Sequence, residues 1–298
     1  MSSASPPRAS STLRSHLASL RRLTLRDRQL LDWLAEHYLL STAQITQALF
    51  PSPRTARLRL KTLHDFGALE RFADITTGTN QHLYALGPVG LLVAPTQWND
   101  PDRPQSRPLR SSAERTARIA ASRTLRHLLG TNQFFVDLLA HARAHPDAHL
   151  QRWWSEQHAT ASWTLAGIRP DGHGVWTAQG RTVGFFLEHD NGTEPLGTVL
   201  GKLRAYSRLA AVGPRYPVLL RVPGPVREAH LLDALTDIPT PMPVATSTHD
   251  RHPAVAAWLL AADPSRRRAL HELPSDHGPD DPPINPHRYQ PTDGRPTA

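Results

Sequence analysis

Side chains in the second half of the chain are of the types and spacing that metal-assisted phosphodiester chemistry uses. Asp171 follows a proline, Glu188 and Asp190 are two residues apart, and Lys202 and Tyr206 are four apart. Carboxylates at the ends of neighbouring strands can hold Mg²⁺ or Mn²⁺, and the ion lowers the pKa of a bound water. A nearby lysine can stabilise developing charge. The pattern predicts these residues as catalytic candidates, with Asp171, Glu188 and Asp190 as metal ligands.

The expected backbone would bring these groups together. Alternation along a strand places Glu188 and Asp190 on one face and His189 on the other, and spacing of four places Lys202 and Tyr206 on one helix face. A purely structural interpretation stays open, because Pro-Asp-Gly is a common turn and His-Asp-Asn-Gly-Thr-Glu carries turn and N-cap signals. Under that interpretation the acids are only strand-end and turn residues, without a catalytic role.

A basic helix is predicted earlier in the chain, from about residue 52 to 65. Its pattern places Ala56, Leu58, Leu60 and Leu63 inward, and Arg54, Arg57, Arg59 and Lys61 largely outward. A helix of this kind can enter the major groove and form salt-sensitive contacts with DNA. The expected DNA contacts are Arg54, Thr55, Arg57, Arg59, Lys61 and Arg71. The alternative is a solvated face on a protein-binding domain.

The elements around this helix predict a winged helix-turn-helix domain over residues 23–93. Thr24 and Ser41 can cap two preceding helices, and Gly67 can end the basic helix. Two short alternating segments, 68–72 and 82–86, flank a polar loop at 74–81 and predict a hairpin wing. The wing would carry Arg71.

The second half alternates between strand and helix patterns. Helices are expected at 112–129, 132–144, 195–209, 226–234 and 254–261, and strands at 151–155, 163–169, 182–187, 216–222 and 243–246. Interleaved strands and helices favour a mixed sheet with helices packed on it. The expected fold class is α/β (α+β), with a mixed-sheet domain over residues 112–262.

The composition of the chain indicates which partners and which kinds of site to expect. The 298-residue chain has a net charge of +8, no cysteine, and lysine only at Lys61 and Lys202. The charge favours polyanionic partners, and the missing thiols exclude disulfides and thiolate metal sites. No stretch reaches the ~20 apolar residues of a membrane span, so a cytoplasmic protein is expected. Residues 1–22 and 273–298 are expected to be a flexible basic lead and a disordered tail, and 94–111 a linker.

The acid-bearing segment resembles the PD-(D/E)xK nuclease fold, also called restriction-endonuclease-like. Pro170-Asp171 stands as its first motif, and Glu188-His189-Asp190 stands where the second would be. Asp190 occupies the place of the usual lysine. Lys202 and Tyr206 resemble the helix motif Q/K-x-x-x-Y of the recombination-nuclease branch, in which the basic residue has moved to the following helix. The resemblance implies a Mg²⁺ or Mn²⁺ cofactor.

The chain also resembles the replication-relaxation family over about residues 23–262. The resemblance rests on the predicted winged helix, on RHLLGTNQFFV at 126–136, on RPDG at 169–172 and on FLEHDNGTE at 186–194. Asn191 stands where the family's E-x-D-R-G-T-E run has arginine. The resemblance implies a role in replication or mobilisation of plasmids and integrative elements in high-GC bacteria.

The sequence therefore predicts a DNA-binding protein of a mobile element, whose nuclease-like second domain either processes DNA or is degenerate. The alternatives are an active Mg²⁺-dependent endonuclease and a winged-helix transcriptional repressor with a protein-binding C-terminal domain. The expected partners are double-stranded DNA and, by resemblance, replication or relaxase proteins. A homodimer stays open, and no membrane partner is expected.

Overall fold

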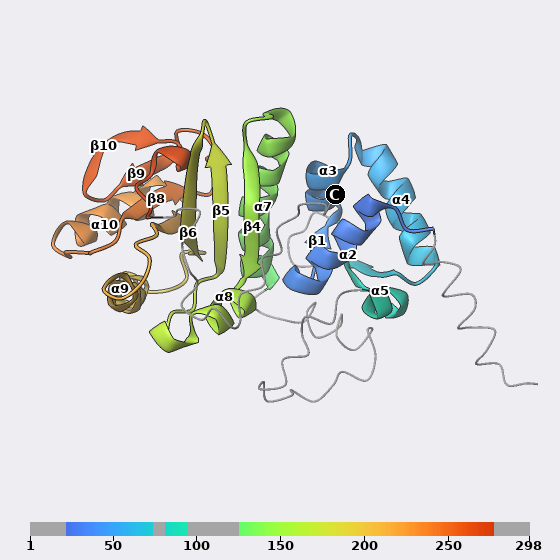
Figure 1. The fold of residues 1–298 in the computed structure, drawn as a ribbon, viewed down its shortest axis with the longest axis horizontal. Helices are drawn as coiled ribbons and strands as arrows, with labels where there is room; N and C mark the ends of the chain where they lie inside the picture. Colours follow the sequence, from blue (N-terminus) through green and yellow to red (C-terminus); the bar gives the residue numbers. More distant parts are fainter. Residues whose placement is uncertain (1–21, 74–80, 94–124, 277–298) are drawn as a thin grey trace, which may run out of the picture. The chain divides into compact units, whose positions relative to one another are not determined.

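The computed structural model describes residues 22–73, 81–93 and 125–276 (Figure 1). The chain divides into two compact units, residues 1–129 (unit 1) and 130–298 (unit 2). Each unit combines helices with a β-sheet, so the fold is mixed α/β, as predicted. The predicted linker, most of the basic lead and most of the tail lie outside the described residues, and so does the loop at 74–80.

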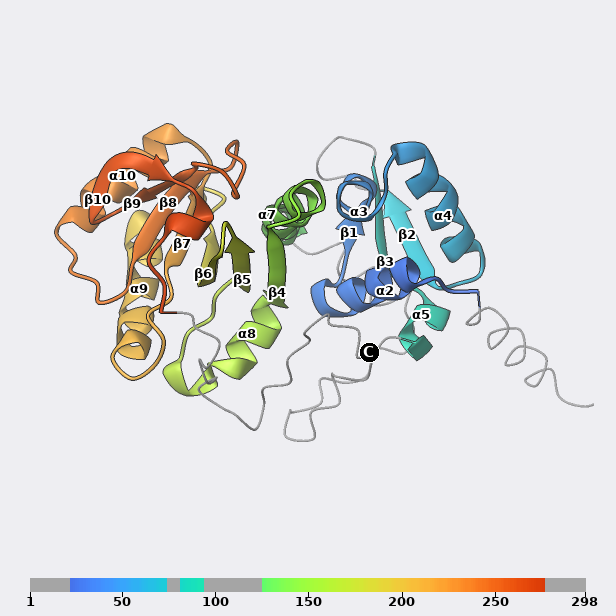
Figure 2. The ribbon, with the colours of Figure 1, turned by 45° about the horizontal axis from the view of Figure 1, so that its top comes forward.

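Unit 1 consists of helices around a small sheet. Its described elements are α2 (Leu25–His37), β1 (Leu40–Ser41), α3 (Thr42–Leu49), α4 (Pro53–Asp65), β2 (Leu69–Ala73), β3 (His82–Leu86) and α5 (Pro88–Val93). The strands pair antiparallel in the order β1-β3-β2. Helix α2 packs against β3, and α4 packs against β2 and α3 (Figure 2). The order of elements is therefore helix, strand, helix, helix, hairpin.

The starts of the unit 1 helices are fixed by the residues that the sequence predicts as caps. Thr24 and Ser41 each form a capping box with the residue three positions later, which satisfies two backbone N–H groups that a helix start otherwise leaves unpaired. Ser52 caps α4, and a proline stands in the first turn. Gly67, with φ of 78°, ends α4 in the left-handed region that glycine adopts without strain.

Unit 2 is built on a seven-stranded mixed sheet in the order β10-β9-β8-β7-β6-β5-β4. The strands are β4 (His149–Ser155), β5 (Gly172–Ala178), β6 (Arg181–His189), β7 (Val218–Val222), β8 (Val244–Thr248), β9 (Trp258–Leu260) and β10 (Asp263–Arg268). Strands β6, β7 and β8 run parallel, and the remaining neighbours pair antiparallel. The helices are α7 (Leu125–Ala144), of which residues 125–129 belong to unit 1, α8 (Glu156–Ser162), α9 (Leu196–Ala210) and α10 (Pro225–Thr236). Short 3-10 turns lie at Thr164–Ala166 and Leu270–Glu272.

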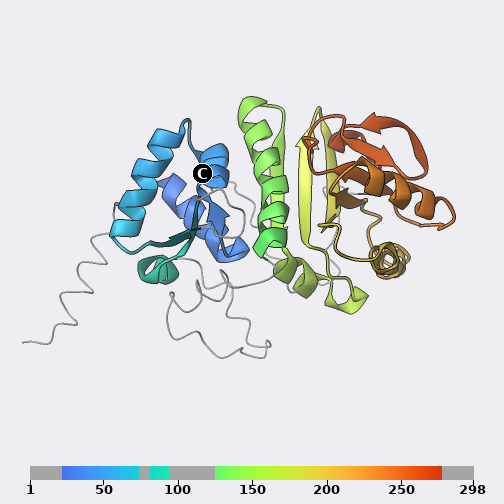
Figure 3. The same ribbon diagram turned by 180° about the vertical axis from the view of Figure 1, so that it is seen from behind.

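Helices cover both faces of this sheet, and side chains of β6 alternate between two cores. Phe185 and Leu187 join the core under α7, which also contains Phe134. Phe186 joins the opposite core, together with Leu203 of α9. Helices α9 and α10 lie on the side of the sheet away from α7 (Figure 3). The alternation puts Glu188, two residues after Phe186, on the α9 side of the sheet.

Several predicted elements of unit 2 are wrong. The segment 163–169 contains a 3-10 turn, Thr164–Ala166, which ends at Gly167 in the left-handed region, and the strand lies later, at β5. The expected helix at 254–261 contains strand β9, because a short apolar run has no period that separates buried strand from helix. Helix α7 runs without a break through Gly130. Leu273 is fully buried, so the ordered chain continues past residue 262. Among the described helices, none is long and apolar enough to span a membrane.

Candidate functional site

The outward face of α4 is the first candidate site. Arg54, Thr55, Arg57 and Lys61 are exposed on this helix, and Arg71 is exposed on β2. Within the part of the chain that the structure describes, Arg54 and Arg57 form no ion pair, and Lys61 Nζ lies 2.5 Å from Asp65 Oδ2 one turn later. The Thr55 hydroxyl donates to the carbonyl of Ser52 at 2.8 Å. The face therefore presents cations to solvent.

Arg59 does not share that face, which corrects its predicted outward orientation. Its Nε donates to Asp27 Oδ1 at 2.9 Å, its Nη2 contacts the other oxygen, and Nη2 also donates to the carbonyl of Arg22 at 3.2 Å. Asp27 is 1% exposed and also accepts from the Thr24 N–H and hydroxyl, both at 2.7 Å. Burial alone would raise the pKa of Asp27, but the hydrogen bonds from Arg59 and Thr24 bring it below its usual value.

Leu58 takes an outward position instead, and its predicted inward orientation is wrong. It is 61% exposed, whereas Ala56, Leu60 and Leu63 are fully buried. Arg59 lies at the edge of this buried stripe, so its long side chain can cross to Asp27 with its apolar stem covered. The exposed face of α4 is thus a mixture of cations, threonines and one leucine.

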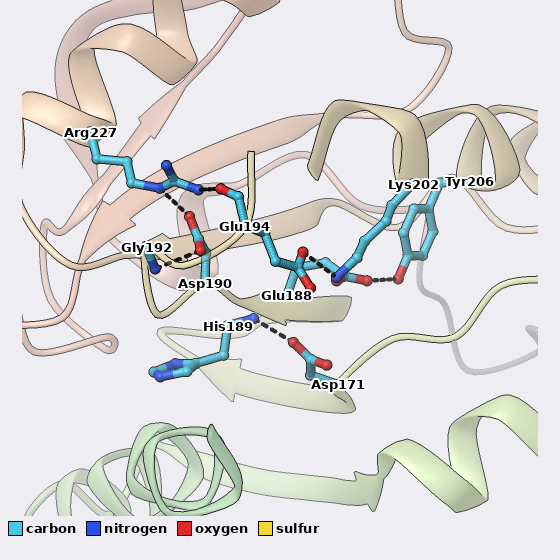
Figure 4. Close-up of polar contacts among 9 residues, drawn as sticks. All are labelled: Asp171, Glu188, His189, Asp190, Gly192, Glu194, Lys202, Tyr206 and Arg227. Atoms are coloured by element: carbon cyan, nitrogen blue, oxygen red, sulfur yellow. Dashed lines mark hydrogen bonds and ion pairs between the residues drawn. The ribbon is translucent and has the colours of Figure 1, made fainter. Parts of the chain in front are cut away.

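The second candidate site is a buried acid on the α9 side of the unit 2 sheet. Glu188, near the end of β6, is 3% exposed. Lys202 Nζ lies 2.9 Å from its Oε2, and the Tyr206 hydroxyl donates to its Oε1 at 2.5 Å (Figure 4). Lys202 Nζ also lies 3.8 Å from Glu194 Oε2. We call Glu188, Lys202 and Tyr206, with their neighbours Asp171 and Glu194, the acid centre.

The electrostatics of the acid centre follow from burial and from neighbouring charges. Burial, and next the negative charge of Asp171, raise the pKa of Glu188 to about 7, although Lys202 and Tyr206 act in the opposite direction. Burial disfavours the Lys202 ammonium, yet Glu188, Asp171 and Glu194 together raise its pKa above the usual value. Burial and the charge of Glu188 raise the pKa of Tyr206. The lysine is therefore held as a cation among acids.

Asp171 lies beside this group at the start of β5. Its Oδ2 accepts the backbone N–H of His189 at 2.7 Å, a contact that ties the start of β5 to the end of β6. The His189 ring packs on the other side of the sheet, against Gly130 of α7, and stacks on His249 with ring centroids 4.2 Å apart. The predicted opposite orientations of Glu188 and His189 are confirmed (Figure 4).

Asp190 belongs to a neighbouring ion pair. Its carboxylate contacts Arg227 of α10 and accepts the Gly192 N–H at 2.7 Å, and Arg227 also donates to the carbonyl of Glu194 at 2.6 Å. Glu194 and Arg227 are not among the site residues that the sequence predicts. Glu194 was visible only as part of a turn, and Arg227 lies 37 residues from Asp190 with no local signal.

The acid centre does not fit a divalent cation as it stands. Both carboxylate oxygens of Glu188 accept from protein donors, and one oxygen of Asp171 accepts from a backbone N–H. In the described ranges, no group of three or more His, Asp or Glu side chains is placed to hold a metal ion. The Mg²⁺ or Mn²⁺ cofactor stays a prediction from the sequence.

A model of the replication-relaxation family matches residues 31–218, which is more than half of the chain. The chain belongs to the replication-relaxation family. The replication-relaxation match runs from within α2 to the start of β7, so it includes both the outward face of α4 and the acid centre. No curated protein and no solved structure matches the chain.

Proposed function

We propose that this replication-relaxation protein binds double-stranded DNA through unit 1, a winged helix-turn-helix domain, and acts in replication or mobilisation of a plasmid or integrative element. The observation that carries the proposal is the outward face of α4, where Arg54, Arg57 and Lys61 meet solvent. Arg54 and Arg57 are unopposed by acids of the described chain, so their charge is available to phosphates or to guanine edges.

The order of elements in unit 1 supports the same proposal. In a helix-turn-helix the first of the two paired helices braces the second, which enters the major groove. Helix α3 packs against α4 in this way, and the β2–β3 hairpin follows α4 directly and carries the exposed Arg71. The hairpin would act as the wing and contact phosphates beside the groove.

For unit 2 we propose a nuclease-like fold whose acid centre is degenerate, so that the unit serves assembly rather than cleavage. Asp171 directly precedes β5, and Glu188 lies near the end of the neighbouring β6. Acids on neighbouring strands are what the resemblance to the PD-(D/E)xK fold implies, and this arrangement supports the proposal. The Lys202 and Tyr206 contacts with Glu188 occupy the oxygens that a catalytic ion would need.

A direct test is fluorescence anisotropy of the full chain on duplex DNA of the element's replication origin. We expect Arg57→Ala to weaken binding by about tenfold at moderate salt, as for the loss of one phosphate contact. Arg266→Ala removes the same charge from an exposed ion pair in unit 2 and should leave the affinity unchanged. If wild type and Arg57→Ala both bind the DNA with equal affinity, Arg57 does not contact the duplex, and the proposed interface on α4 is wrong.

The active endonuclease is the second candidate, favoured by one observation. Asp171 accepts the backbone N–H of His189, the residue after Glu188, so two acids stand at the ends of neighbouring strands, and a pair of carboxylates is what a Mg²⁺ site needs. Incubation of supercoiled plasmid with the full chain and Mg²⁺ or Mn²⁺ tests it. If wild type nicks the plasmid and Asp171→Asn does not, the acid centre is an active endonuclease site and the proposal of a degenerate centre is wrong.

The transcriptional repressor alternative shares the DNA-binding unit and differs in its target. Footprinting of the full chain over the origin and promoters of its element separates the two. Protection of the origin supports replication or mobilisation, whereas protection confined to promoters supports repression. Neither outcome depends on unit 2 chemistry.

A further inference from the structure

Leu58 is exposed on the same face of α4 as the cations of the proposed DNA interface. Arg54 precedes it by four residues and Lys61 follows it by three, and on a helix these spacings place side chains next to each other. All three side chains are exposed, whereas Leu60 of the same helix is fully buried. An apolar side chain is therefore flanked by groups that attract phosphates.

Two threonines stand beside Leu58 on this face and offer little polarity to a ligand. Thr55 lies three residues before Leu58 and Thr62 four residues after it, and both are exposed. The Thr55 hydroxyl donates to the carbonyl of Ser52 at 2.8 Å, and the Thr62 hydroxyl donates to the carbonyl of Leu58 at 3.0 Å. Both hydroxyl hydrogens are thus used by the helix itself. Leu58 is the wholly apolar member of this strip, which runs beside the cations.

The position of Leu58 decides what it can contact. A single exposed leucine is ordinary on a protein surface, but α4 is the helix that the proposed function places in the major groove. Of the four bases, thymine alone presents a methyl group in that groove, and apolar side chains recognise thymine through it. Arg54 and Lys61 would hold the helix against the phosphates, which brings the leucine between them to the base edges.

We propose that Leu58 is a specificity-determining residue of the DNA interface and contacts the C5-methyl group of a thymine in the major groove. The inference rests on the proposed binding of duplex DNA by unit 1, and it adds a base preference that phosphate contacts do not provide. The cations fix the helix on the backbone, and Leu58 favours sites with thymine at one position. Because this contact is apolar, it adds nothing to the salt dependence of binding.

The test compares two duplexes by fluorescence anisotropy with the full chain. One is the replication-origin duplex, and the other has the same sequence with uracil in place of every thymine, which removes only the C5-methyl groups. Burial of one methyl-sized group corresponds to about fourfold in affinity. Wild type should therefore bind the thymine duplex about fourfold more tightly than the uracil duplex. Leu58→Ala should bind the two duplexes with nearly equal affinity.

Two further variants separate the methyl contact from a general effect of losing an exposed leucine. Leu58→Met keeps an apolar side chain of similar volume and should keep most of the affinity ratio between the duplexes. Leu92→Ala removes a leucine of similar exposure, 66%, from α5 of the same unit and should keep the wild-type ratio. If Leu58→Ala weakens binding to both duplexes equally, Leu58 contacts something other than a thymine methyl, such as a second copy of the chain, and the proposal is wrong.

Failure of this inference and failure of the DNA interface give different results. If wild type binds the origin duplex and the uracil duplex with equal affinity, the role of Leu58 is wrong, while the cationic interface on α4 stands. If wild type binds neither duplex, the DNA interface itself is wrong, and the role of Leu58 is wrong with it.

Discussion

Replacing Asp27 with alanine should destabilise unit 1 far more than its size suggests. Asp27 is the acid of the α2 capping box and the buried partner of Arg59, so one carboxylate joins the start of α2 to the middle of α4. The variant removes both connections at once. Asp65→Ala is the matched control, because Asp65 also pairs with a base of α4 but both side chains are more than half exposed.

The magnitude follows from the two contacts. Loss of the capping-box hydrogen bond from the Thr24 N–H to the Asp27 carboxylate costs about 1 kcal/mol. Removing one partner of a buried ion pair costs about 3 to 5 kcal/mol, but the Arg59 side chain is 29% exposed and regains water, so we take less than half of that value. The free energy of unfolding of unit 1 should fall by about 2 to 3 kcal/mol. For the exposed pair of Asp65 the change should be small, because solvent screens that pair.

Amide hydrogen exchange of the full chain can measure the loss of stability separately for the amides of unit 1. The protected amides of α2 and α4 should exchange about 30 to 160 times faster in Asp27→Ala, the ratio that corresponds to that free energy. Because the folded-state pKa of Asp27 is depressed, the difference from wild type should be complete above the ordinary value of 3.8 and disappear as the pH falls through the folded pKa. Equal protection in Asp27→Ala and Asp65→Ala would refute the reasoning.

Three further predictions concern packing and charge. Gly130→Ala should destabilise unit 2 by about 1 to 3 kcal/mol in denaturant unfolding, because its Cβ would lie 2.2 Å from the buried ring of His189. The control Gly201→Ala, in open space on α9, should stabilise unit 2 by up to about 1 kcal/mol in the same assay. Because the folded-state pKa of Glu188 is raised from 4.5 to about 7, the unfolding free energy of wild type minus that of Glu188→Gln should fall as pH rises through that window; a difference that rises would contradict it. Leu58→Ala should change stability by less than about 0.5 kcal/mol and the fully buried Leu60→Ala by about 2 to 5 kcal/mol; similar losses in thermal unfolding would place Leu58 in the core.

The elements of unit 1 were predictable because their signals are local. Thr24, Ser41 and Ser52 stand directly before the helices that they cap, and each apolar stripe has the helical period. The outward orientation of Leu58 and the inward orientation of Arg59 were not predictable. They depend on Asp27, which lies 32 residues away and provides a buried partner for an arginine at the edge of the stripe.

Unit 2 was harder to predict because its sheet is covered on both faces. Strands of that kind lose the alternation of apolar and polar residues that marks a half-exposed strand. Strand β5 also carries glycines, which usually argue against a strand, yet here they admit aromatic rings: a Cβ on Gly174 would lie 2.3 Å from Phe185. Strand β5 was therefore not predicted, because the close packing that requires its glycines cannot be read from the local sequence.

The acid centre was partly predictable from spacing. The four-residue interval between Lys202 and Tyr206 places both on the face of α9 that meets Glu188, as expected. The separation of Asp190 from that group could not be read from the sequence, because it depends on Arg227 from a helix beyond the next strand. The catalytic and metal roles of these residues remain predictions.

The salt dependence of DNA binding tests the central claim most directly, because it counts the cations that meet phosphates. With Arg54, Arg57, Lys61 and Arg71 engaged, log K of the full chain should fall against log salt with a slope near about −3.6. The Arg54→Ala/Arg57→Ala variant should bring the slope to about −1.8. Identical slopes for wild type and the variant would show that the outward face of α4 does not touch the duplex.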